Sequence, residues 1–217
     1  MSKVIVIGGS AGAINALKLI LPTLPHDLPA AILIVTHIGS QRSILPEILG
    51  RYSSMPVRHA TDGEPIVPGR VLVAFPDEHL MVVKNGNRAY ARLVHGPKEN
   101  HCRPAIDPLF RSAAKVFGPY AIGIVLSGYL DDGTIGLQAI KTCRGITVVQ
   151  NPAEAEASDM PFSVHGRPRF AKHSIHDSVK VKIAPVHPDF VCDDLPLSLM
   201  GSAGWCPYRS IALRVLA

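Results

Sequence analysis

Residues 4–13 of the chain are VIVIGGSAGA, a short apolar run that ends in a serine, Ser10, among glycines and alanines. An aliphatic run that stops at Gly8 and Gly9 is typical of a buried strand followed by a tight turn. Residues 13–21 (AINALKLIL) carry apolar side chains at helical spacing, so a helix comes next. The stretch therefore predicts a strand, a turn and a helix, which is the opening unit of an α/β fold.

The same alternation continues along the chain. A second apolar run at residues 30–35 and a short helix at 43–52 predict parallel strands joined by right-handed crossovers. Short β-like pieces fill the middle of the chain, and Asn85-Gly86 between two of them predicts a hairpin turn. We therefore expect an α/β fold with a doubly wound, mainly parallel sheet, helices on both faces, and a β-hairpin or meander insertion on one edge. The remaining predicted elements are β pieces at 56–60, 71–75, 80–84 and 89–94, strands at 120–126 and 146–150, and helices at 104–117 and 134–143.

The composition fits one domain of 217 residues, with 47% hydrophobic residues and a formal net charge of +5. We expect residues 1–168 to form the main part of the domain and residues 169–217, where the periodicity weakens, to complete the same domain. No apolar stretch reaches the roughly 18 residues of a membrane helix, and no dense Lys/Arg block marks nucleic-acid binding. The four cysteines form no CxxC pair and match no zinc spacing. We expect a cytoplasmic protein without membrane insertion, nucleic-acid partner, metal or other cofactor.

Three chemically active residues follow three predicted strands. Ser10 ends the first strand, His37 ends the second, and Asp132 lies in the loop SGYLDDG after the strand at 120–126. The carboxyl ends of parallel strands share one edge of the sheet, where ligands bind in open α/β folds. A histidine there can take the serine proton and a carboxylate can fix its tautomer, so the set predicts nucleophilic catalysis. The serine turn also fits G-x-S-x-G, in which the following amide, here that of Ala11, is a natural oxyanion donor.

A glycine-rich turn before a helix is also a common form of phosphate-binding loop. This alternative predicts a non-catalytic module that binds an anion or a partner and does not need His37. It leaves the shared sheet edge of Ser10, His37 and Asp132 unexplained.

Six separated stretches of the chain, spread over roughly residues 3–165, are VIVIGGSAGA, ILIVTHIG, PDEHLMV, HCRPAIDPLFRSAA, IVLSGYLDDGTIGLQAIK and VVQNPAEAEASDMP. Together and in this order they resemble the catalytic domain of the chemotaxis protein-glutamate methylesterases (CheB). The resemblance implies a serine esterase that hydrolyses glutamate methyl esters on the cytoplasmic region of chemoreceptors and releases methanol. Relatives also deamidate certain receptor glutamines with the same groups.

The resemblance implies a role for each matching position. The site residues that it implies are Ser10 (nucleophile), His37 (base), Asp132 (orienting carboxylate), Ala11 and Tyr129 (oxyanion amides) and Arg103 (candidate substrate-binding side chain). Asp131 is the second choice for the orienting carboxylate. We expect His79 and His101, which lie in or beside matching stretches, to be mainly structural.

Two departures from the family pattern bear on regulation and on the serine turn. Members usually carry an N-terminal receiver domain, whereas here the first catalytic strand begins at Val4, so we expect a stand-alone esterase or one regulated by a separate protein. Residue 11 is Ala where many relatives have Thr, and residues beyond about 168 match poorly. The alternatives left open are an acyl hydrolase with another substrate, the anion- or receptor-binding module, and an esterase that has lost turnover.

Overall fold

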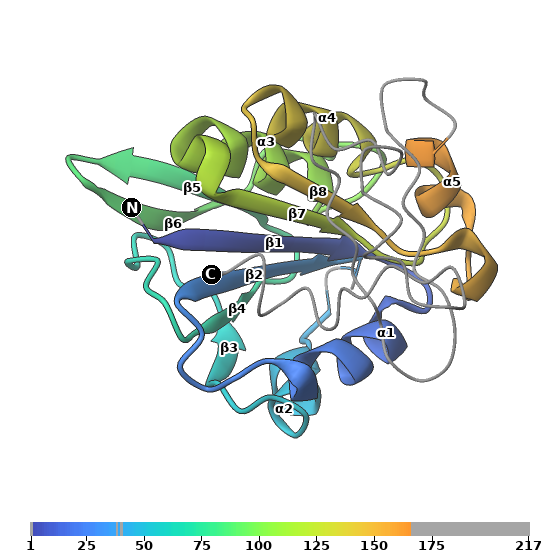
Figure 1. The fold of residues 1–217 in the computed structure, drawn as a ribbon, viewed down its shortest axis with the longest axis horizontal. Coiled ribbons are helices and arrows are strands. Elements are labelled where there is room, and N and C mark those ends of the chain that lie inside the picture. The colour runs from blue at the N-terminus through green and yellow to red at the C-terminus, as the bar shows by residue number, and fades with distance from the viewer. Residues whose placement is uncertain (1, 38, 40, 166–217) are drawn as a thin grey trace, which may run out of the picture.

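Figure 1 shows the fold in the computed structural model of the chain, which describes residues 2–37, 39 and 41–165. A 6-stranded parallel sheet has the order β3-β4-β2-β1-β7-β8, and two further strands form a separate antiparallel sheet. The strands are β1 (Lys3–Gly9), β2 (Ala30–Thr36), β3 (Val57–His59), β4 (Val71–Val73), β5 (His79–Asn85), β6 (Arg88–Val94), β7 (Ala121–Val125) and β8 (Ile146–Val149). The α-helices are α1 (Ala13–Ile20), α2 (Leu45–Gly50), α3 (Ile106–Phe117), α4 (Thr134–Thr142) and α5 (Asp159–His165), and short 3-10 turns cover Leu21–Thr23, Gly118–Tyr120 and Pro152–Glu154.

β1 lies between β2 and β7, and the direction of the connections reverses there. The chain passes from β1 to β2 on one side and later returns to β7 on the other side. In open α/β sheets such a reversal opens a crevice at the carboxyl ends of the strands, and this crevice is the usual ligand site. The residues that follow β1, β2 and β7 therefore meet at the position where the fold favours a site.

The sheet is buried on both faces, because its side chains alternate between two apolar clusters. Val4 and Val6 of β1 belong to the cluster that includes α3 and α4, whereas Ile5 and Ile7 belong to the cluster that includes α1 and α2. Figure 1 shows α3 and α4 on one side of the sheet and α1 and α2 on the other. The doubly wound arrangement predicted from the sequence is confirmed.

The hairpin of β5 and β6 is also confirmed. Asn85 pairs with Arg88, so the hairpin turn lies at Gly86 and Asn87. The hairpin packs on α3, where the Val82 amide donates to Ser112 Oγ over 2.9 Å. This contact joins the hairpin to the helix that borders the candidate site.

The β pieces at 56–60 and 71–75, grouped from the sequence with the hairpin as an insertion or meander on the sheet edge, are not part of the hairpin sheet. β3 and β4 instead extend the parallel sheet beyond β2, because β4 pairs with β2 and β3 pairs with β4. Each of these strands has 3 residues. A strand of this length does not indicate from its sequence whether its partner is parallel or antiparallel, so only the tertiary pairing decides.

The last described helix, α5, was not predicted from the sequence. It has 7 residues and contains Pro161 near its start, which hides any helical periodicity. Within the described part of the chain, no helix is both long and apolar enough to cross a membrane. The predicted segment 169–217, with Cys192 and Cys206, lies outside the described residues.

Candidate active site

Ser10 occupies the turn between β1 and α1, and two backbone hydrogen bonds fix that turn. The Ser10 amide donates to the Ser127 carbonyl after β7 (2.8 Å), and the Ala13 amide donates to the Ser10 carbonyl (3.1 Å). Gly12 has a φ of 78°, a left-handed conformation that glycine adopts at no steric cost. The turn is therefore a strand–turn–helix elbow that ties the serine to the neighbouring strand.

His37 follows β2, directly beside the serine turn. Gly9 pairs with Thr36 in the parallel register of β1 and β2, so Ser10 and His37 are the next residues on adjacent strands. Adjacent strands lie about 4.8 Å apart, which brings the two side chains within reach of each other. Within the described part of the chain, the Ser10 hydroxyl makes no hydrogen bond to His37. The two residues lie at the same edge of the sheet but their side chains are not hydrogen-bonded to each other.

The imidazole of His37 is joined to Asp132. His37 Nε2 lies 2.8 Å from Asp132 Oδ2, although the two residues are 95 positions apart in the sequence. The His37 side chain is 16% exposed and that of Asp132 only 2%. Because Nε2 is hydrogen-bonded to the carboxylate, the other ring nitrogen, Nδ1, is free to accept a proton from a hydroxyl. The pair has the chemistry of a histidine base with an orienting carboxylate.

Asp132 is held by main-chain and side-chain donors. The Ile106 amide donates to Oδ2 (2.7 Å) and the Asp107 amide to Oδ1 (3.2 Å), so the carboxylate caps the N-terminus of α3. Asn100 Nδ2 also donates to Oδ1 (2.7 Å). Burial tends to raise the pKa of Asp132, but the hydrogen bonds from His37, the Ile106 amide and Asn100 outweigh it and hold the pKa below its ordinary value. Asp132 is therefore ionised at neutral pH and accepts permanently from its donors.

The neighbouring Asp131 takes no part in this arrangement. It is exposed, and its carbonyl accepts from the Thr134 amide at the start of α4 (3.1 Å). Of the two candidate carboxylates in the sequence, Asp132 is the one that contacts His37.

Two amide groups lie close to the serine without an acceptor. Ala11 directly follows Ser10, and Tyr129 follows Gly128, whose backbone passes so near that a Cβ on it would lie 3.0 Å from Ser10 Cβ. Within the described residues, neither the Ala11 nor the Tyr129 amide donates to an acceptor. Tyr129 is 62% exposed, so its side chain is not buried against the serine turn.

A cavity of about 220 Å³ opens beside His37. Its lining includes Lys98 and Arg103, which are cationic, together with Asp77. Arg103 Nε donates to Asp77 Oδ1 (2.9 Å), and this hydrogen bond holds the pKa of Asp77 below its ordinary value. Arg103 is thus fixed in the wall of the cavity next to the histidine. A larger cavity of about 490 Å³ is lined by residues such as Ser2 and Phe117, and none of the site residues lies in it.

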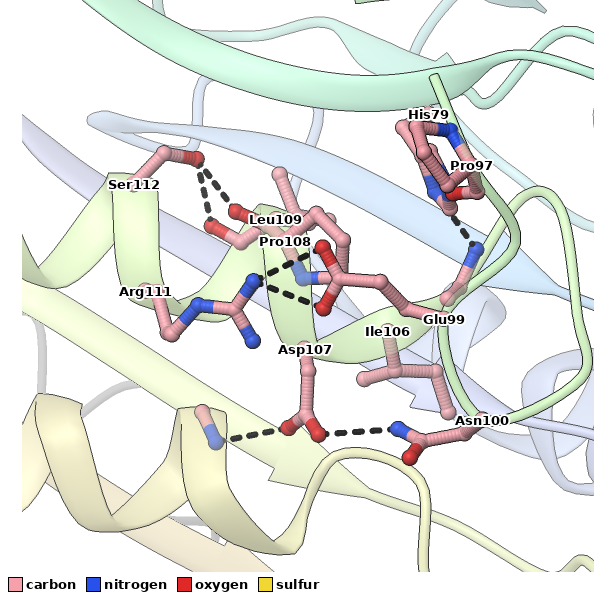
Figure 2. Close-up of polar contacts among 12 residues, drawn as sticks. His79, Pro97, Glu99, Asn100, Ile106, Asp107, Pro108, Leu109, Arg111 and Ser112 are labelled. Carbon is pink, nitrogen blue, oxygen red and sulfur yellow. Dashed lines mark hydrogen bonds and ion pairs between the residues drawn. The ribbon is translucent and has the colours of Figure 1, made fainter. Parts of the chain in front are cut away.

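The other sequence candidates have mainly structural contacts. His79 Nε2 lies 2.9 Å from the Pro97 carbonyl, and His79 Nδ1 accepts from the Ala105 amide (3.2 Å; Figure 2 shows His79 and Pro97). His101 lies in an exposed turn and lines the cavity beside His37. The Met160 amide donates to the Gly128 carbonyl (2.9 Å), which places the start of α5 against the same edge of the sheet.

Sequence reasoning missed two residues next to Asp132. Asn100 Nδ2 donates to Asp107 Oδ2 (2.9 Å) as well as to Asp132, and Asp107 Oδ1 accepts from the Gly136 amide (2.6 Å). Asp107 is only 2% exposed. The only signal in the sequence was that Asp107 lies in the first turn of a predicted helix. A carboxylate there is stabilised by the positive end of the helix dipole, but this does not identify its hydrogen-bond partners.

A carboxylate of the protein lies at the place where an anion loop would bind its ligand. A Cβ on Gly12 would lie 2.6 Å from Glu156 Cβ and 3.1 Å from Glu156 Oε2, at the N-terminus of α1. Asn15 of α1 donates to the same oxygen (3.2 Å). A negative charge there repels phosphate, so the placement of Glu156 argues against the anion-loop alternative.

Comparisons with known proteins agree on one family. The family described as CheB methylesterase matches residues 5–172. The protein-glutamate methylesterase/protein-glutamine glutaminase 1 of Xanthomonas euvesicatoria pv. vesicatoria is 39% identical over 163 residues, which are 75% of this chain and 46% of that protein. A Leptospira interrogans protein, to which the same activity is provisionally assigned, is 41% identical over 162 residues, which are 74% of this chain and 82% of that protein.

A solved structure has the same fold. The crystal structure of the CheB methylesterase catalytic domain of Thermotoga maritima matches with a TM-score of 0.74 and 32% sequence identity, over 76% of this chain and 88% of that one. The chain spans about half the length of the Xanthomonas relatives. The matched range includes Ser10, His37 and Asp132. On this agreement in sequence and fold, the chain belongs to the CheB methylesterase family.

Proposed function

We propose that the chain is a protein-glutamate methylesterase in which Ser10 attacks the ester, His37 takes the serine proton and Asp132 orients His37. The observation that carries this proposal is the 2.8 Å contact between His37 Nε2 and Asp132 Oδ2, at the sheet edge that also bears the serine turn. A buried, ionised carboxylate bound to a histidine is the arrangement that base-assisted attack by a hydroxyl requires.

In the first step, Ser10 Oγ attacks the ester carbonyl carbon while its proton passes to His37 Nδ1. Asp132 stabilises the imidazolium that forms. The carbonyl oxygen becomes negative, and the free amides of Ala11 and Tyr129 are the donors that would stabilise it. When the tetrahedral intermediate collapses, the methoxy group takes the proton from His37 and leaves as methanol.

In the second step, water attacks the acyl group on Ser10. Its proton passes to His37 as the new oxygen–carbon bond forms. Collapse of this second intermediate breaks the bond to Ser10 Oγ, which recovers a proton from His37. The product is the glutamic acid side chain, which ionises at neutral pH, and the enzyme returns to its starting state.

The substrate that fits this chemistry is a methylated cytoplasmic region of a chemoreceptor. Lys98 and Arg103 line the cavity beside His37, and such cations would attract carboxylates that flank the ester in an acidic segment. Because Asp77 holds Arg103 in place, this guanidinium needs no reordering to meet a substrate.

Deamidation of glutamine is a second candidate activity, and the names of the relatives favour it, since they pair methylesterase with protein-glutamine glutaminase. The same groups would act: Ser10 attacks the amide carbon, and His37 protonates the departing nitrogen, which leaves as ammonia. No further residue is needed for the change of leaving group.

The test is methanol release from a methylated chemoreceptor cytoplasmic fragment. Ser10→Ala should lower the rate by more than about 10³-fold, because nucleophile and base act as one unit. Ser53→Ala, the same change in the loop after α2, should leave the rate unchanged. Release that persists in Ser10→Ala would assign the nucleophile elsewhere, and no release by the folded intact chain would refute the esterase. Ammonia release from a glutamine-containing fragment tests the second activity with the same variants.

A further inference from the structure

Asn100 links two buried carboxyl groups with one amide. Its Nδ2 donates to Asp132 Oδ1 (2.7 Å) and to Asp107 Oδ2 (2.9 Å), and Figure 2 shows the contact with Asp107. Asp132 and Asp107 are 1% and 2% exposed. A side-chain amide nitrogen carries two N–H donors, so Asn100 uses both of them on these carboxyl groups.

Each of the two carboxyl groups also accepts from amides at the N-terminus of the neighbouring helix. Asp132, just ahead of α4, accepts from the Ile106 and Asp107 amides at the start of α3. Asp107, in the first turn of α3, accepts from the Gly136 amide in the first turn of α4. Each carboxyl group is therefore fixed to the backbone of the opposite helix on one side and to Asn100 on the other.

A tight turn presents Asn100. Glu99 and Cys102 exchange two backbone hydrogen bonds (3.1 and 2.8 Å) around Asn100 and His101, whose φ values are 49° and 63°. Positive φ at both central residues is typical of type I′ turns, which favour asparagine. Arg111 Nη2 of α3 donates to both carboxylate oxygens of Glu99 (2.9 and 2.7 Å; Figure 2), which anchors the turn to the helix.

We propose that Asn100 is a positioning residue of the esterase centre: its amide holds Asp132 in place for His37 and keeps Asp132 apart from the second buried carboxyl, Asp107. This inference rests on the proposed function, because it takes His37 as the base. Among the described residues, His37 and Asn100 are the only side chains that hydrogen-bond to Asp132. Asn100 therefore acts through Asp132 and touches no reacting atom.

The charges around the two carboxyl groups support this role. Burial raises the pKa of Asp107, and the nearby charge of Asp132 adds to the rise against the hydrogen bonds from the Gly136 amide and Asn100. The other ionisable groups that face the pair are His37, Cys102 and Arg111, and Arg111 is paired with Glu99. Asn100 thus stands between a carboxyl whose pKa is raised and one whose pKa is held down by its donors.

The sign of the expected pH effect follows from this arrangement. A carboxylate with fewer donors is less stable in its ionised form, so the Asp132–His37 pair takes up a further proton, on His37 Nδ1, at higher pH. The esterase needs Nδ1 free of that proton to accept from Ser10. Loss of Asn100 should therefore move the acid limb of the kcat/KM–pH profile to higher pH, and a carboxylate at position 100 should move it furthest.

The test compares Asn100→Gly and Asn100→Asp in the full chain, because glycine and aspartate both tolerate a positive φ. We expect kcat/KM for methanol release to fall about 10- to 100-fold near neutral pH, the loss expected for a hydrogen bond to a charged group. The acid limb should move up by about one pH unit. NMR titration of the His37 ring C–H signals should show a shift in the same direction. That readout needs no turnover, so it tests Asn100 even if the wild type hydrolyses no ester.

Two controls separate positioning from a structural role. Asn87→Asp, the same change in the β5–β6 turn, should leave both readouts unchanged. The double variant Asn100→Asp/Asp107→Asn exchanges the two side chains. It keeps the net charge and still places an amide against a carboxylate, so it would restore the wild-type profiles if Asn100 only stabilised the local structure. Asp132 still faces a carboxylate in that variant, so the shift should persist. The proposal would be overturned if folded Asn100→Gly and Asn100→Asp both had the wild-type pH profile and His37 titration. It would also be overturned if the double variant regained them.

Discussion

Replacement of Asp132 by asparagine keeps the shape of the side chain and removes its charge. In the wild-type protein, Oδ1 accepts from Asn100 and the Asp107 amide, whereas Oδ2 accepts from His37 and the Ile106 amide. An asparagine has one acceptor oxygen and one NH2 group. Its NH2 group must therefore face one of these two pairs of donors.

The lower-energy orientation places the NH2 group toward His37. On the Oδ1 side the Asp107 amide can only donate, and Asn100 would lose its hydrogen bond to Asp107 if it turned its oxygen inward, whereas an imidazole can change its tautomer. His37 Nε2 then accepts from the new amide, and the ring proton moves to Nδ1. In the proposed mechanism Nδ1 accepts the proton of Ser10, so a proton on Nδ1 blocks the base. We expect kcat to fall about 10⁴-fold, as for a triad histidine held in the wrong tautomer.

The same variant should also lose stability. The Ile106 amide at the start of α3 is left without an acceptor, which costs about 1–3 kcal/mol of unfolding free energy. The pKa of Asp132 is lowered in the folded state, so its stabilising contribution is present above the unfolded value of about 3.9 and is lost as the pH falls through the folded value. The stability difference between wild type and variant should therefore be largest near neutral pH and shrink in acid.

Urea denaturation near neutral pH and in acid measures the stability difference, and methanol release measures kcat. Asp131→Asn is the matched control, because it makes the same change in the exposed neighbour. It should leave kcat within about twofold and stability within about 0.5 kcal/mol. A kcat for Asp132→Asn within about tenfold of wild type would refute the tautomer argument, because a histidine held in the wrong tautomer should lower kcat by far more than tenfold.

Two further predictions concern the proposed oxyanion amide and the cationic wall of the cavity. Tyr129→Ala should leave kcat within about threefold, whereas Tyr129→Pro, which removes the amide N–H, should lower kcat about 10²- to 10³-fold; equal losses in both would assign the effect to the side chain. Arg103→Ala should raise KM with little change in kcat, and an unchanged KM would remove Arg103 from substrate binding. The pKa of Asp77 should rise in Arg103→Ala, which NMR titration of its carboxyl carbon would show, because the Arg103 hydrogen bond is what lowers it.

The central part of the sheet was predictable because its strands leave a strong pattern. All 7 residues of β2 are buried, and those at positions 30–35 are apolar without interruption, as expected for a parallel strand covered on both faces. β3 and β4 carry no such pattern, since each has 3 residues. Their parallel pairing depends on the free edge that β2 offers, and that edge exists only after the sheet has formed.

In the candidate site, too, some residues could be predicted from the sequence and others could not. Ser10, His37 and Asp132 were predictable because each follows a recognisable strand, and parallel strands bring their carboxyl ends together. The contacts of Asn100 and Asp107 were not. Asn100 lies in a two-residue turn with positive φ, and such a turn leaves no apolar periodicity in the sequence. Asp107 accepts from the Gly136 amide, which lies 29 positions further along the chain. Both contacts follow from the packing of α3 on α4, which the sequence pattern does not encode locally.

The packing of α3 and α4 also explains how a loop residue can orient the proposed catalytic base, His37. Asp132 lies in the loop between β7 and α4, and loops are usually the least fixed part of a fold. Here the oxygen that meets His37 also accepts from the first amide of α3, so its position is set by a helix rather than by the loop. α3 is in turn held by α4 and by the hairpin, through the contact of Val82 with Ser112. The geometry of the histidine is thus tied to the buried core, while Tyr129 in the same loop remains exposed and able to meet a large substrate.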